Sequence, residues 1–75
     1  MPKLRRVSGE EAIRALERLG FERIRQRGSH VILKKQTPQG AMGCVVPLHR
    51  ALAVGTLRGI LQMARVQPEE FMEKL

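Results

Sequence analysis

RIRQRGSHVILKK, residues 23–35, is the stretch around which the rest of the chain is organised, because it has the pattern of a β-hairpin. Gly28-Ser29 is a turn signal between two extended segments. The segment before it, residues 21–27, is predicted to form a first strand. The segment after it, residues 30–35, has the apolar centre Val31–Leu33 and is predicted to form a second strand.

The first of these strands has an unusual distribution of charge. Side chains alternate between the two faces of a strand, so Arg23, Arg25 and Arg27 are expected to share one face. Three arginines on one face cannot lie in a core. We therefore expect this face to contact solvent or a partner, either on the open side of a sheet or along its edge.

A helix is predicted immediately before the hairpin, over residues 10–19. Ser8 and Glu11 have the spacing of a capping box, in which each side chain accepts from the backbone N–H of the other residue. Gly20 stands where a left-handed residue ends many helices. The apolar stripe of this helix has helical spacing and consists of Ala12, Ile13, Leu16 and Leu19.

After the hairpin, the pattern predicts a loop over residues 36–41 and a third strand over residues 42–46 that stops at Pro47. A second helix is predicted to start near Gly55-Thr56, and a short one near residues 67–70, where a proline is followed by two acids. The predicted fold is α+β: an antiparallel three-stranded sheet in the order α-β-β-β-α with a short extra C-terminal helix.

The composition indicates a polyanionic partner. The 75 residues suffice for a single domain over residues 1–75, with a net charge of +7. Residues 23–66 hold eight Lys or Arg and no acidic residue, which favours nucleic acid as a partner. A basic protein that binds no nucleic acid remains the alternative.

The single cysteine, Cys44, excludes an intramolecular disulfide and fits a reducing cytoplasm. No apolar run of 18 residues is present, so we expect no membrane partner. A zinc site built from His30, Cys44 and His49 would lack closely spaced ligand pairs, so no metal and no small-molecule cofactor is expected.

His30 is the main candidate for chemistry, because a histidine exchanges protons near neutral pH. RNA carries its own nucleophile, the 2′-hydroxyl, and His30 could remove its proton or protonate the leaving oxygen. This chemistry needs no metal. The neighbouring Arg and Lys side chains could stabilise charge on the phosphorus. The alternative is a polar residue at a strand start that bonds a local backbone group.

Two further features leave alternatives open. His49 is either a second proton-transfer group or a loop residue that caps the second helix. Gly55-Thr56 could offer backbone N–H groups to a phosphate, but any helix N-terminus has this appearance. The chain has no Trp or Tyr, and Phe21 and Phe71 belong to apolar stripes, so recognition of RNA would use its backbone and shape.

Three segments together resemble the HicA toxin family, also called YcfA-like mRNA interferases. They are Gly28-Ser29-His30, Val46-Pro47 followed by His49, and Gly55-Thr56-Leu57 followed by Ile60-Leu61. The resemblance covers residues 8–75. It implies a double-stranded-RNA-binding-domain-like fold with the order α-β-β-β-α, which agrees with the order predicted from the pattern.

The resemblance also implies a function: a metal-independent endoribonuclease that cleaves mRNA, neutralised by a HicB-type antitoxin. The catalytic histidine of the family corresponds to His30. The residues expected to bind RNA are Arg23, Arg25, Arg27, Ser29, Lys34 and Lys35. Many family members carry a second polar or histidine residue soon after the catalytic one, whereas Val31–Leu33 follow here, so the supporting acid or base is not identified.

Two other classes of function stay open at this point. A non-catalytic RNA- or DNA-binding module of the same fold would bind nucleic acid without cleaving it, and His30 distinguishes this reading from the enzyme. A pure protein-interaction partner would show no salt-sensitive binding to RNA.

Overall fold

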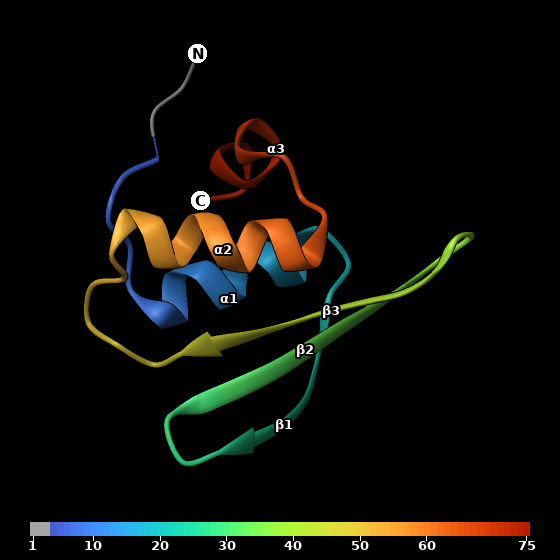
Figure 1. Cartoon of the computed structure of the whole chain (residues 1–75), viewed down its shortest axis with the longest axis horizontal. Helices are drawn as coiled ribbons and strands as arrows, with labels where there is room; N and C mark the ends of the chain where they lie inside the picture. The colour runs from blue at the N-terminus through green and yellow to red at the C-terminus, as the bar shows by residue number, and fades with distance from the viewer. Residues whose placement is uncertain (1–3) are drawn as a thin grey trace.

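The structure is a computed structural model that describes residues 4–75. Three strands form one antiparallel sheet in the order β1-β2-β3, with β2 in the centre (Figure 1). The α+β fold and the order α-β-β-β-α with a final short helix are confirmed. The elements are α1 (Gly9–Arg18), β1 (Glu22–Arg27), β2 (His30–Thr37), β3 (Gly40–Pro47), α2 (Val54–Ala64) and α3 (Pro68–Glu73).

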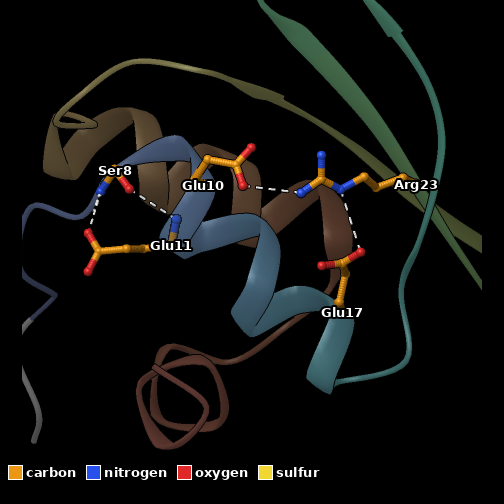
Figure 2. A network of polar contacts seen from close by, with 5 residues as sticks. All are labelled: Ser8, Glu10, Glu11, Glu17 and Arg23. Atoms are coloured by element: carbon orange, nitrogen blue, oxygen red, sulfur yellow. Dashed lines mark hydrogen bonds and ion pairs between the residues drawn. The ribbon is translucent and has the colours of Figure 1, made fainter.

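The first helix begins and ends as its sequence predicts. The backbone N–H of Glu11 donates to the hydroxyl of Ser8 over 3.0 Å, and the backbone N–H of Ser8 donates to the Glu11 carboxylate over 2.9 Å (Figure 2). This pair satisfies donors that a helix N-terminus otherwise leaves free. At the other end, Gly20 has a φ of 102°, a conformation that glycine adopts readily.

The second hairpin departs from the prediction of a loop over residues 36–41. The β2–β3 register continues to the pair Thr37 and Gly40, which leaves only a two-residue turn. The Thr37 hydroxyl donates to the carbonyl of Gly40 over 2.6 Å and accepts from the backbone N–H of Gln39 over 3.2 Å. These bonds close the turn, and the hairpin projects as a ribbon beyond the helices (Figure 1).

The core lies between the sheet and the helices. Val31 and Leu33 of β2 and Cys44 and Val46 of β3 are buried beneath the helices, whereas no residue of β1 is buried. The helices therefore cover one face of the sheet and leave the other face open. The largest buried side chains contributed by the rest of the chain are Phe71, Ile13, Leu16, Leu52, Leu57 and Leu61.

The last two helices are joined at a backbone position with positive φ. Helix α2 follows Ala53, which makes no side-chain cap, and ends at Arg65, which has the left-handed φ of 57°. Helix α3 has a capping box between Gln67 and Glu70 and is anchored by the buried Phe71. None of the helices within residues 4–75 has the length and apolarity needed to cross a membrane.

Candidate nucleic-acid interface

The register of β1 divides its arginines between the two faces of the sheet. Arg23 pairs with Leu33 and Arg25 pairs with Ile32, so Ile24 is an extra residue at a β-bulge. A bulge reverses the alternation of side chains along a strand. The prediction that all three arginines share one face is therefore wrong, because it assumed an unbroken period of two.

Arg23 lies on the side of the helices, where it binds α1. Its guanidinium forms ion pairs with the carboxylates of Glu10 over 3.2 Å and Glu17 over 3.5 Å (Figure 2). The two glutamates are two turns apart on one side of α1, and the arginine bridges them. Arg23 therefore joins the otherwise exposed β1 to the helical layer. Its expected contact with RNA stays a prediction.

The opposite face of the sheet carries the candidate site. Cross-strand partners point to the same side of a sheet, so three rows of partners define what we call the open sheet face. These rows are Arg27–His30–Pro47, Arg25–Ile32–Val45 and Glu22–Lys34–Gly43. The face thus combines three cations and a histidine with one acidic residue and the apolar pair Ile32 and Val45.

His30 is held at the edge of a tight turn. It is exposed, it is the first residue of β2, and it lies opposite Arg27 across the hairpin. The backbone N–H of Leu48 donates to the carbonyl of Ser29 over 2.6 Å, which extends the β2–β3 pairing past His30. The side-chain amide of Gln26 donates to the backbone carbonyl of Gly28 over 2.9 Å, and Gly28 has a positive φ of 58°. A bond from β1 and one from the residue after β3 therefore fix the turn that precedes His30.

Lys34 and Lys35 lie on opposite faces, as neighbours in a regular strand must. Lys34 belongs to the open sheet face, whereas Lys35 is half-buried on the helix side. The ammonium of Lys35 lies 5.8 Å from the centroid of the Phe21 ring, a cation–π distance. Of the residues expected to bind RNA, the structure thus places Arg25, Arg27 and Lys34 on the same face as His30 and Ser29 next to it in the turn, but it places Arg23 and Lys35 on the helix side.

His49 belongs to a different part of the surface. Its carbonyl accepts from the backbone N–H of Gly9 over 2.9 Å, and its side chain is exposed. It lines a hollow of about 240 Å³ together with Ser8, Glu10, Leu48 and Arg50. This position beside the start of α1 gives His49 a structural contact that the sequence did not indicate.

Neither metal ligands nor a reactive thiol accompany His30. Within residues 4–75, no group of three or more His, Cys, Asp or Glu side chains could hold a metal ion. Burial raises the pKa of the Cys44 thiol to about 11, so it is neutral and inert at physiological pH. His30 is thus the exposed histidine of the open sheet face.

Comparison with known families identifies the chain. Residues 9–66 match the family described as "HicA toxin of bacterial toxin-antitoxin". The chain belongs to the HicA toxin family. No match was found among curated proteins. The part of this HicA chain that matches runs from the start of α1 to just past α2, so it includes the whole sheet and His30.

Two contributors to the site of this HicA protein were not anticipated from its sequence. The apolar partners Ile32 and Val45 are adjacent on the open sheet face, and Val45 is 40% exposed. Val45 was expected only as part of a strand. Val45 is two residues from Pro47, and this spacing was the signal that could have placed Val45 on the same face as Pro47, the partner of His30.

Proposed function

We propose that this toxin is an endoribonuclease that cleaves mRNA and uses His30 as its catalytic residue. The observation that supports this most strongly is the position of His30: exposed, on a cationic face, and directly opposite Arg27. A histidine held among arginines and a lysine is suited to phosphodiester chemistry on a polyanion. The proposal agrees with membership of the HicA toxin family.

The proposed reaction is transesterification within the RNA. His30 accepts the proton of a 2′-hydroxyl, whose oxygen attacks the adjacent phosphorus and forms a P–O bond. The bond from phosphorus to the 5′-oxygen of the next nucleotide breaks, and that oxygen takes up a proton from the histidinium or from water. The products are a 2′,3′-cyclic phosphate and a free 5′-hydroxyl. Because RNA supplies the nucleophile, the reaction requires no metal.

The cations around His30 have separate roles in this scheme. Cross-strand neighbours have Cβ atoms about 5 Å apart, so Arg27 can reach the phosphate on which His30 acts and stabilise the charge of the transition state. Arg25 lies one row further along the face, and Lys34 lies two rows away. Their spacing suits contacts with the neighbouring phosphates of the same strand, which would hold the RNA in register.

Base recognition by this face would be limited. Both phenylalanines are buried, at 3% exposure for Phe21 and 0% for Phe71, and neither can stack on a base. The apolar pair Ile32 and Val45 can instead contact a sugar or the face of a base. We therefore infer that affinity comes mainly from the RNA backbone.

A HicB-type antitoxin is the proposed inhibitor, and the open sheet face is its proposed target. Cations surrounding an apolar pair suit an acidic protein surface with an apolar centre. A partner that covers His30 and Arg27 excludes the substrate and the chemistry together. No conformational change of the toxin is needed for this mode of inhibition.

The decisive test compares His30→Ala with His49→Ala, using purified protein and a defined RNA. We expect His30→Ala to lower the cleavage rate by about 10²-fold or more, the usual contribution of a general acid–base group. His49→Ala, a control histidine outside the open sheet face, should cleave at close to the wild-type rate. Circular dichroism establishes that both variants are folded, and expression in cells shows whether growth arrest and transcript loss depend on His30.

The proposal fails if folded His30→Ala cleaves RNA at the wild-type rate. If wild-type protein binds RNA in a salt-sensitive way but does not cleave it, the chain is a non-catalytic nucleic-acid-binding module. If it binds no RNA at all, its function lies in protein interactions alone.

A further inference from the structure

A second hollow lies on the helix side of the sheet, away from His30. It has a volume of about 290 Å³ and lies between the projecting β2–β3 hairpin, including Thr37 and Gln39 at its turn, and the C-terminal end of α2. Its apolar walls come from Met42 of β3, from Ala64 and Val66 at the end of α2, and from Leu19 and Phe21 between α1 and β1. The site is thus a concave apolar surface that the proposed RNA chemistry does not use.

The hollow is bordered by cations that lack acidic partners. Lys35 and Arg65 both line it. Within residues 4–75, every ion pair involves Arg23, so neither of these two cations has a carboxylate partner there. The one acid in the lining is Glu70, and its carboxylate already accepts from the backbone N–H of Gln67 over 3.1 Å. The hollow therefore favours a ligand with negative charge at its border.

The fold fixes the ammonium of Lys35 and the backbone of Arg65. The ammonium of Lys35 lies over the Phe21 ring. Arg65 occupies the left-handed position that ends α2, an uncommon conformation for a residue other than glycine. Next to this hollow lies a further one of about 470 Å³, which is also lined by Arg65 and Val66 and which adds Arg58. The positive border thus continues along α2.

The lining favours a protein segment over RNA as the occupant. Phe21 is only 3% exposed and offers no surface on which a base could stack. Apolar walls with a charged border fit an apolar anchor of a protein partner. Members of a toxin–antitoxin family act with a dedicated protein partner, which supplies an occupant.

We propose that this hollow, which we call the hairpin pocket, receives a bulky apolar side chain flanked by carboxylates from a segment of the antitoxin. The apolar side chain fills the space against Leu19, Met42 and Val66, and the carboxylates pair with Lys35 and Arg65. The hairpin pocket and the open sheet face lie on opposite sides of the sheet. This contact therefore holds the toxin independently of any contact that covers His30.

The test is an NMR titration of the ¹⁵N-labelled full chain with the peptide acetyl-Glu-Leu-Phe-Glu-amide. A matched peptide with both glutamates replaced by lysine is the control. We expect the acidic peptide, and not the basic one, to shift amides around Phe21, Met42 and Val66. Amides of the open sheet face around Ile32 should not move.

Two substitutions test the charges of the pocket. Arg65→Asp should weaken acidic-peptide binding by about threefold or more, and aspartate is among the residues that tolerate the left-handed conformation. Glu70→Gln should strengthen it about two- to fivefold, since glutamine can still accept from Gln67 in the capping box. Arg27→Glu, on the opposite face, should leave peptide affinity unchanged.

Three results would overturn the proposal. One is a set of peptide shifts centred on the open sheet face. Another is peptide affinity that responds to neither Arg65→Asp nor Glu70→Gln. A third is that RNA shifts the pocket amides and the acidic peptide does not. A 2′-O-methyl RNA serves for this arm, because it lacks the nucleophile and cannot be cleaved in this way. Because no arm measures cleavage, failure here is distinct from failure of the proposed nuclease function.

Discussion

Arg27 and His30 are direct cross-strand partners, the last residue of β1 and the first residue of β2. Only Gly28 and Ser29 separate them in the chain, so a short hairpin turn is sufficient to place the two residues opposite each other. The same turn is bonded to Leu48 beyond the end of β3. The local turn thus places a cation opposite the histidine, and a bond from a segment distant in sequence fixes that turn against the end of β3.

The division of arginines by the bulge predicts different effects of two substitutions. Arg25→Ala or Lys34→Ala should each reduce the slope of log affinity against log salt by about 1, because each removes one phosphate contact. Arg23→Ala should leave that slope unchanged and lower the free energy of unfolding by about 0.5–1 kcal/mol, through loss of its exposed ion pairs with α1. Filter binding at several salt concentrations and urea unfolding measure the two effects. Equal slopes for Arg23→Ala and Arg25→Ala would show that both arginines contact RNA.

The shared use of the open sheet face predicts competition between RNA and the antitoxin. With the His30→Ala protein, which is not expected to cleave, saturating antitoxin should abolish RNA binding. Charge reversal at Arg25 or Arg27 should weaken both interactions in parallel. Fluorescence anisotropy of labelled RNA, with the antitoxin as competitor, provides the measurement. Simultaneous binding without mutual loss of affinity would exclude a shared surface.

Two helical glycines should respond in opposite ways to alanine. A Cβ at Gly9 would collide with the carbonyl oxygen of Pro47 and lie 2.9 Å from the Cα of Leu48, so Gly9→Ala should destabilise the fold by about 2–3 kcal/mol. A Cβ at Gly59 of α2 meets nothing within 4 Å, so Gly59→Ala should stabilise it by about 0.5–1 kcal/mol. Urea denaturation of both variants tests the contrast. A mild effect at Gly9 would mean that α1 does not pack this closely on the end of β3.

The capping box of α1 predicts a pH dependence. The backbone N–H of Ser8 donates to the Glu11 carboxylate and lowers the pKa of that carboxyl below its ordinary value of 4.5. The stabilisation is therefore present above pH 4.5 and is lost as the pH falls through the lowered folded-state pKa. The difference in free energy of unfolding between wild type and Glu11→Gln should shrink as the pH falls below 4.5. A difference that stays constant down to pH 2 would contradict the role of the charged carboxylate.

Much of the fold could be predicted from local patterns. Ser8 and Glu11 begin a helix, Gly20 ends it, and Gly28-Ser29 turns the chain, because each of these signals acts through backbone bonds within a few residues. The length of the second hairpin could not be predicted in this way. Its strands extend to Thr37 and Gly40 because a side-chain hydroxyl closes a turn that the composition suggested was a loop.

The sequence by itself therefore determined the order of elements, the cationic character of the middle of the chain and the candidacy of His30. Only the tertiary structure decided which cations surround that histidine. The bulge at Ile24 carries no glycine or proline that would mark it, and it sends Arg23 toward Glu10 and Glu17, which are distant in sequence. The face of the sheet on which each arginine of β1 lies depends on how β1 pairs with β2. That register is a property of two strands in contact and cannot be read from either strand alone.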